Sequence, residues 1–385
     1  KPNLSHQEKK FQLSSDKKKS LAKIKKLLLS RDIDNIDLGV EFLVGLNDAD
    51  LFNILLDGCK LETIEDNETN NFETKLHTNK IFTGSGPAQP FLNYALLNII
   101  GCIPENQNIN IDNSLAFKNI TSLNITSLNF YKLNAMFNID KFTHLNKVII
   151  HFSEFGKVNF TDYFKNSSVK EIIASGVGGS LKWLNNFKQL EVLKLSLSWL
   201  GKAEDYDAFN SLTSLKELEI DCPNEIDFLK NCYSIKKLRL NIFEKTSTFN
   251  IDALKHLNNI EELDIIDLTN KFIPMFSTAS ISNCNNLRKI MYKTDMYMYD
   301  DDLALIEKAQ DNRFRQLLDI LKNIKSCEIL EHLTLITKDN QRFREEVGAS
   351  LNLKVDISGF NGMEVLPNLK EIKINKIQLS INNSN

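Results

Sequence analysis

The sequence lacks the features of a membrane-spanning or nucleic-acid-binding protein. No apolar run approaches the roughly 20 residues that a membrane-spanning helix needs. The first residues, 1–10, contain no apolar signal core. The 385 residues carry a formal net charge of -3, so the chain as a whole has no electrostatic attraction to nucleic acid or to acidic membranes. We therefore expect neither a membrane span nor specific nucleic-acid binding.

The sequence patterns of common catalytic sites are also missing. There is no phosphate-binding glycine loop, no H-E-x-x-H and no G-x-S-x-G. The glycine-rich residues 176–180 are too short for a phosphate loop and fit a tight corner between structural units. The histidines are scattered, and none has a partner at metal-ligand spacing. We predict no cofactor, no metal and no enzymatic activity.

Cysteine is scarce and shows no ligand spacing. The six cysteines form no C-x-x-C motif and no Cys/His cluster. Cys232, Cys284 and Cys327 occupy equivalent apolar positions, where a free cysteine behaves as a small buried side chain. Reduced cysteines favour a cytoplasmic location. A leader removed before Lys1 would favour the alternative, a secreted or cell-surface protein.

A recurring phrase, L-x-x-L-x-L, organises the last two-thirds of the chain. Copies begin at Leu190, Leu215, Ile235 and Ile260, so the starts advance by 25, 20 and 25 residues (190 to 215, 215 to 235, 235 to 260). Each phrase predicts one short strand with its apolar residues inward. A unit of this length cannot bury its own apolar side, so it must stack on the next unit.

Further copies extend the array in both directions. They lie at residues 145–150, 169–174, 287–292, 330–335 and 369–374. Another copy is either 120–125 or 125–130, and the sequence leaves these two registers open. Apolar residues at intervals of three, such as Phe209, Leu212 and Leu215, precede the strands and predict a short helix or 3₁₀ turn.

The phrase and its spacing resemble the leucine-rich repeat superfamily, and the Asn, Lys and Ile content suggests a bacterial source. Segment 207–215 is similar to a surface-protein subclass of bacterial repeats. The asparagine usual after the strand is missing, however, because Ser198, Pro223, Phe243 and Leu268 stand there. The resemblance implies an α/β leucine-rich-repeat solenoid: a curved parallel β-sheet with a helical or 3₁₀ outer side. Such solenoids usually bind macromolecules and rarely catalyse reactions.

A small α-helical module is predicted before the repeats. Apolar periodicity predicts helices over 16–29, 35–46, 48–56 and 91–100, with Asn47 or Asp48 capping the third helix. The segment from about residue 60 to 90 is polar, which predicts a connector between the third and fourth helices. The expected domains are therefore an N-terminal module, 1–112, and a solenoid, 113–385, with insertions at about 293–323 and 338–362. The lysines between residues 17 and 26 are interpreted as a solvated helix face.

The residues on either side of the second leucine of each phrase should point outward from the sheet. Between Lys194 and Lys289 these two outward columns nearly alternate in charge, as in Lys237 and Glu262. Opposite charges on adjacent strands attract, so the centre of the face should neutralise itself. It is then a poor candidate for a strongly acidic or basic partner.

Both ends of the face are different and provide the candidate partner-binding residues. The upstream group is Ile149, Ile173 and Val192. The downstream group is Met291, Tyr292, Met296, Tyr297 and Tyr299. Aromatic and thioether side chains are typical anchors of protein interfaces. The alternatives are burial of the isoleucines under the N-terminal module, and packing of the Tyr/Met run under its own insertion.

The sequence thus predicts a non-enzymatic scaffold that binds a protein partner through the sheet face and the C-terminal insertions. One alternative is a secreted or surface-exposed bacterial adhesin or effector. Another is an enzyme whose catalytic residues lie in the helical module. The sequence identifies neither the partner nor the oligomeric state.

Overall fold

The computed structural model describes residues 13–66, 71–104, 109–126, 141–151, 168–197, 203–221, 226–242, 251–267, 284–294, 329–337, 371–374 and 377–380. The chain divides into two compact units. Unit 1 consists of residues 1–176 and 186–190, and unit 2 of residues 177–185 and 191–385. The domain boundary that the sequence predicts at residue 112 stays a prediction.

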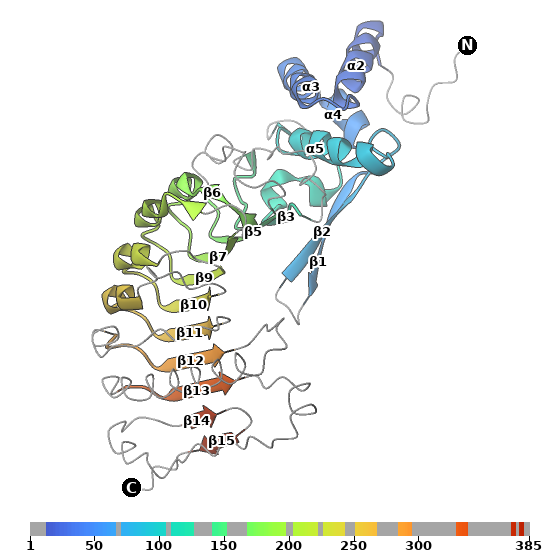
Figure 1. Ribbon diagram of the computed structural model, residues 1–385. Helices are drawn as coiled ribbons and strands as arrows, with labels where there is room; N and C mark the ends of the chain where they lie inside the picture. The colour runs from blue at the N-terminus through green and yellow to red at the C-terminus, as the bar shows by residue number, and fades with distance from the viewer. Residues whose placement is uncertain are drawn as a thin grey trace, which may run out of the picture. The chain divides into compact units, whose positions relative to one another are not determined.

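Within the described residues of unit 1, four helices form close to their predicted positions (Figure 1). They are α2 (Ser15–Leu28), α3 (Ile33–Leu46), α4 (Ala49–Leu56) and α5 (Gln89–Ile100). The side chain of Asp32 caps α3 by accepting a hydrogen bond from Asn35 N at 3.0 Å. Asp48 caps α4 in the same way, through Asp50 N at 3.0 Å. These short acidic side chains satisfy amides that have no partner within the helix.

Helices α2 and α3 pack closely because Gly39 leaves room between them. A Cβ at Gly39 would lie 2.9 Å from the Cβ of Leu27. The inward sides of both helices are fully buried, as at Ile24 and Ile36. Lys17 links α2 to the start of α4, because its Nζ lies 2.8 Å from Asp48 and 2.6 Å from Asp50. The first lysine of the basic cluster is therefore structural, while Lys18 and Lys19 are exposed, as predicted for a solvated face.

The expected polar connector contains a β-hairpin, which corrects the interpretation of residues 60–77. Strands β1 (Lys60–Asp66) and β2 (Asn71–His77) pair antiparallel from Lys60 opposite His77 to Asp66 opposite Asn71. One side of the hairpin is buried at Leu61, Phe72 and Thr74. The other side is exposed and, apart from Ile64, polar, so few apolar residues signal the strands. A 3₁₀ turn, η1 (Gly86–Ala88), leads into α5.

The hairpin caps the first strand of the sheet. Thr74 Oγ1 accepts a hydrogen bond from Asn124 N at 2.9 Å, and Asn124 Nδ2 donates to the carbonyl oxygen of Phe72 at 2.5 Å. Lys147 Nζ lies 5.5 Å from the centroid of the Phe72 ring. An edge strand exposes unpaired backbone groups, and the hairpin satisfies part of that edge.

Three parallel strands of the repeat array lie in the described residues of unit 1. They are β3 (Ser122–Asn124), β4 (Lys147–His151) and β5 (Glu171–Val177). Two 3₁₀ turns, η2 (Asn113–Leu115) and η3 (Phe117–Asn119), precede β3. Leu123 pairs with Val148, so the first repeat uses the 120–125 register. Ile120, Leu123 and Ile125 are all buried, which resolves the choice that the sequence left open.

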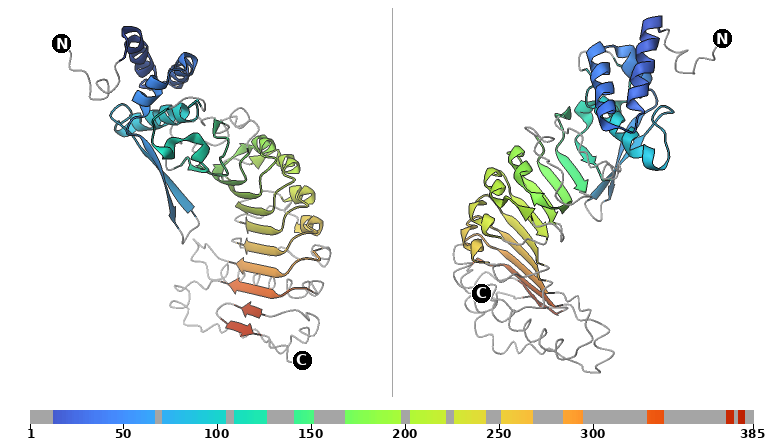
Figure 2. Two further views of the ribbon diagram at one scale, coloured as in Figure 1. Left: turned by 180° about the vertical axis from the view of Figure 1, so that it is seen from behind. Right: turned by 45° about the horizontal axis from the view of Figure 1, so that its top comes forward.

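Unit 2 continues the pattern with seven strands that follow one another in chain order (Figures 1 and 2). Six of them are β7 (Val192–Leu197), β9 (Glu217–Asp221), β10 (Lys237–Ile242), β11 (Glu262–Asp267), β12 (Lys289–Thr294) and β13 (His332–Thr337). The seventh is β14 (Glu371–Ile374), and all pairings between them are parallel. The register aligns the second leucine position of each phrase, from Leu193 opposite Leu218 to Leu333 opposite Ile372. This alignment stacks the buried side chains into one continuous core.

Short 3₁₀ helices precede the strands, as the spacing of three predicts. They are η7 (Lys182–Asn186), η8 (Tyr206–Ser211), η9 (Asp227–Asn231) and η10 (Ile251–His256). Aromatic rings pack between neighbouring turns, with the Phe209 and Phe228 centroids 4.3 Å apart. A minor pair of strands, β6 (Gly179–Ser180) and β8 (Ala203–Glu204), lies outside the main ladder.

The ladder of unit 2 ends with an antiparallel strand. Strand β15 (Ile377–Ser380) pairs with β14, with Ile374 opposite Ile377. The predicted insertions at about 293–323 and 338–362 fall almost entirely outside the described residues. Their proposed role in partner binding therefore stays a prediction.

We predict that Asn124→Ala loosens the hairpin. The substitution removes the amide that satisfies the buried Phe72 carbonyl, so unfolding should become easier by on the order of 1 kcal/mol. Urea denaturation measures this change, and hydrogen exchange should become faster across residues 71–77. Lys75→Ala, on the exposed side of the hairpin, is the control and should leave both measurements nearly unchanged.

Candidate binding face

The outward side chains of unit 2 form three columns that run across the strands. The first column is Val192, Glu217, Lys237, Glu262, Lys289 and His332. The second is Lys194, Glu219, Arg239, Asp264, Met291 and Thr334. The third is Ser196, Asp221, Asn241, Ile266 and Lys293. The sequence predicted the first two, but not the third, which lies beyond the end of the L-x-x-L-x-L phrase.

Ion pairs connect the first column, as the alternation of charge predicted. Glu262 accepts from both neighbours, with Lys237 Nζ at 2.9 Å and Lys289 Nζ at 3.4 Å. The hydrogen bond from Lys237 is the main reason that the pKa of Glu262 lies below its usual value. In unit 1, Lys147 and Glu171 form the equivalent pair at 2.9 Å.

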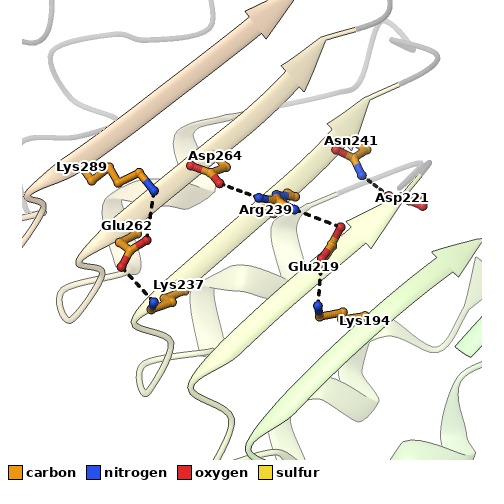
Figure 3. Close-up of polar contacts among 9 residues, drawn as sticks. All are labelled: Lys194, Glu219, Asp221, Lys237, Arg239, Asn241, Glu262, Asp264 and Lys289. Atoms are coloured by element: carbon orange, nitrogen blue, oxygen red, sulfur yellow. Dashed lines mark hydrogen bonds and ion pairs between the residues drawn. The ribbon is translucent and has the colours of Figure 1, made fainter. Parts of the chain in front are cut away.

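The second column is centred on Arg239 (Figure 3). Its guanidinium lies 3.5 Å from Glu219 and 3.0 Å from Asp264, and Lys194 approaches Glu219 from the other side at 3.8 Å. The Asp264 side chain is only 12% exposed, so solvent screens this contact least. A planar guanidinium suits this bridging position because it carries donors on several sides.

The third column places a polar pair where sequence reasoning identified nothing. Asn241 Nδ2 donates a hydrogen bond to Asp221 across adjacent strands. Burial raises the pKa of the Asp221 carboxyl group, and the Asn241 bond lowers it only in part. Asn241 Oδ1 is buried and has no hydrogen-bond partner in the described part of the chain. This column lies one residue past the end of each phrase, so extending the phrase by one residue would have revealed it.

Another set of ion pairs lies where the chain enters the strands. Lys216 contacts Glu191 at 2.6 Å, Lys236 contacts Glu261 at 2.8 Å and Arg288 contacts Glu331 at 3.4 Å. Each of these residues directly follows the first leucine of its phrase. The sequence pattern did not predict ion pairs at this position. Together with the outward columns, they leave the centre of the face largely neutralised by its own neighbours.

The upstream candidates occupy two different places. Ile149 and Ile173 are direct neighbours in register in unit 1, and both are half-buried. They are therefore not fully covered by the N-terminal module. Val192 lies in the first column of unit 2, beside Glu217, and is also half-buried. The structure thus brings the two isoleucines together and assigns Val192 to another column.

The downstream candidates need one correction. Met291 is outward and half-buried, but Tyr292 is only 1% exposed, so it belongs to the core and cannot anchor a partner. Its position is the last inward position of its phrase, which explains the burial. Ile266, missed in the sequence, is outward and half-buried on the strand beside Met291. Met296, Tyr297 and Tyr299 lie outside the described residues.

The buried cysteines of the described residues are poor candidates for nucleophilic catalysis. Cys59 and Cys232 are free and buried, and Cys284, whose Sγ lies 3.6 Å from the carbonyl oxygen of Leu254, is buried too. Burial raises the pKa of Cys59 to about 11 and that of Cys232 to about 12, so these thiols are poor nucleophiles at neutral pH. Within the described ranges, no three His, Cys, Asp or Glu side chains are grouped to hold a metal. None of the helices in those ranges is long and apolar enough to cross a membrane.

Comparisons with known proteins find only remote similarity. No protein-family model matches the sequence, and no curated protein shows significant similarity to it. Among solved structures, internalin C2 of Listeria monocytogenes is similar at 13% identity over 55% of this chain and 87% of that one, with a TM-score of 0.35. Another internalin of that organism, inlF, is similar at 12% identity over 78% of this chain and 84% of that one, with a TM-score of 0.36.

Because these similarities are low, the fold assignment depends on the chain itself. Parallel strands stack in register at each L-x-x-L-x-L phrase, and a 3₁₀ turn precedes most of those in unit 2. That combination defines an α/β leucine-rich-repeat solenoid preceded by a helical module.

We predict that Arg239→Met destabilises the protein by about 1–3 kcal/mol, because it leaves the carboxylates of Glu219 and Asp264 without their shared cation. Lys194→Met removes a longer, more exposed contact at 3.8 Å and should change stability by less than about 1 kcal/mol. Chemical denaturation of both variants tests the ranking, and equal losses would contradict it.

Asp221→Asn should stabilise the protein at neutral pH. The folded pKa of Asp221 is raised, so its contribution to stability is present at low pH and is lost as pH rises through the folded pKa. An amide at this position carries no charge to desolvate and brings a donor near Asn241 Oδ1. Melting temperatures from pH 4 to pH 8 should show a gain that grows with pH. A gain that is independent of pH would argue against titration of Asp221.

Proposed function

We propose that this protein is a non-enzymatic scaffold that binds a protein partner through the outward face of its repeats. The observation that carries the proposal is the pair Ile149 and Ile173. Both occupy outward positions in which the central strands of unit 2 carry charges, and both stay half-buried. Apolar side chains held on a rigid sheet are typical anchors of protein interfaces.

The surroundings of this pair suit an uncharged contact. On one side Lys147 and Glu171 neutralise each other at 2.9 Å, and on the other His151 Nδ1 lies 2.8 Å from Ser175 Oγ. A partner that places an apolar side chain on the isoleucines would therefore leave these polar pairs intact. Such an interface has an apolar centre and a polar rim, which is the usual arrangement in protein complexes.

A second contact region in unit 2 would centre on Met291 and Ile266. Both side chains are half-buried and outward, next to Asp264 and Lys293. We propose that Met296, Tyr297 and Tyr299 extend this region, since they follow β12 directly in the chain. The Tyr297→Ala/Tyr299→Ala variant tests that extension separately from the isoleucine pair.

We propose a cytoplasmic location for this protein, supported by the free, buried thiols of Cys59 and Cys232. Secretion or surface display is the alternative. Cell fractionation of the native source distinguishes the two locations, because a secreted or surface protein would be absent from the cytoplasmic fraction.

The test of partner binding is a pair of charges placed at the candidate site. Ile149→Lys with Ile173→Glu continues the alternation already present in Lys147 and Glu171, so the sheet should remain folded. Immobilised wild type and variant are exposed to an extract of the native source, and captured proteins are quantified by mass spectrometry. We expect at least one protein to be enriched by the wild type and reduced about tenfold or more by the variant, which corresponds to about 1.4 kcal/mol.

The matched control exchanges a charge pair in the centre of unit 2. Lys237→Glu with Glu262→Lys exchanges this pair, and Glu217→Lys with Lys289→Glu reverses its two neighbours in the column. The fourfold variant keeps the net charge and every pairing, so it should retain the captured protein. Circular dichroism confirms that all variants are folded. If the control loses the protein as strongly as the isoleucine variant, the binding site lies elsewhere.

A further inference from the structure

Helix α3 is apolar on its outward side as well as on its inward side. Its inward residues, including Ile36, Val40 and Leu43, are buried. On the outward side, Leu38 is 52% exposed and Leu46 is 39% exposed, and the half-buried Phe42 lies between them in sequence. Spacing by four residues places these three side chains in one row, the apolar row. A helix that is apolar on both sides is usually covered on both sides.

A row of lysines from α2 runs beside the apolar row. Lys23 Nζ lies 4.4 Å from the centroid of the Phe42 ring, and Gly39 of α3 packs against Leu27 and Leu28. Lys19 and Lys26 are four and three residues from Lys23, so they lie on the same side of α2. All three lysines are exposed, and we call them the basic row.

Acidic residues lie on the other side of the apolar row. Asp34 and Glu41 are exposed and are separated by seven residues, or nearly two helical turns, so they share one side of α3. On the helix they are rotated away from Phe42, which faces the lysines. The surface therefore carries three parallel rows in a fixed order: basic, apolar, acidic.

We propose that this three-row surface binds a second copy of the same chain. A twofold axis parallel to α3 places the apolar rows of the two copies together. It also places the basic row of each copy opposite the acidic row of the other. This surface is thus complementary to itself, which an interface with twofold symmetry requires. Gly45, whose Cβ position has no atom within 4 Å, allows close approach of the two helices.

Other occupants fit this surface less well. An acidic membrane surface would attract the basic row but repel Asp34 and Glu41. A helix from an unrelated protein would need opposite charges on its two sides in matching order, a condition that a second copy meets automatically. The proposed dimer uses the helical module and is independent of the proposed partner-binding face.

Sedimentation velocity tests the proposal on the full chain, whose protomer mass is 44.1 kDa. The wild type should form a dimer that dissociates on dilution. Lys19→Glu/Lys23→Glu and Asp34→Lys/Glu41→Lys should each remain monomeric, because like charges then face each other. An equimolar mixture of the two variants should form a heterodimer, because reversed rows match when one variant meets the other.

The control is Lys18→Glu/Lys25→Glu, which changes the same amount of charge on the side of α2 that faces away from Phe42. It should dimerise like the wild type. Leu38→Ala removes apolar area without a change in charge and should weaken dimerisation several-fold, with helix content unchanged by circular dichroism. A wild type that stays monomeric, or a mixture that fails to associate, overturns the proposal. So does a dimer that both reversed variants retain.

Discussion

The stacking of buried apolar side chains between successive repeats is the constraint on which the rest of the structure depends. Each repeat contributes a short strand whose inward residues, such as Leu218 and Leu238, are almost completely buried. A single unit cannot enclose them, so neighbouring strands must align the same positions. The register of Leu218 opposite Leu238 then determines which outward side chains become neighbours.

The outward face shows how a parallel sheet accommodates many charges. Once the register is fixed, Arg239 faces Glu219 on one strand and Asp264 on the other, and both contacts form. Each such pair adds little stability at a solvated surface, but mismatched registers would bring like charges together. The same pairing leaves little unbalanced charge for a partner. Binding is therefore expected where the outward residues are apolar, as at Ile149 and Ile173.

The N-terminal part of the chain serves the repeats and also exposes a surface of its own. Its hairpin satisfies the edge of the first strand through Thr74 and Asn124. Helix α3 buries one side and exposes apolar Leu38 and Leu46 on the other. A helical cap for the first repeat would need only the buried side. The exposed apolar side thus points to a second role for the module, apart from the repeats.

The sequence by itself determined the repeats, their inward residues and two outward columns, because these follow from local periodicity. It also contained the signal for Tyr292, whose inward position in the phrase outweighs its character as an interface residue. Only the tertiary structure decided the register of the first repeat and the presence of the hairpin. It also decided the pairing of Asp221 with Asn241. These features depend on contacts between distant segments, as between Thr74 and Asn124, and local periodicity carries no information about such contacts.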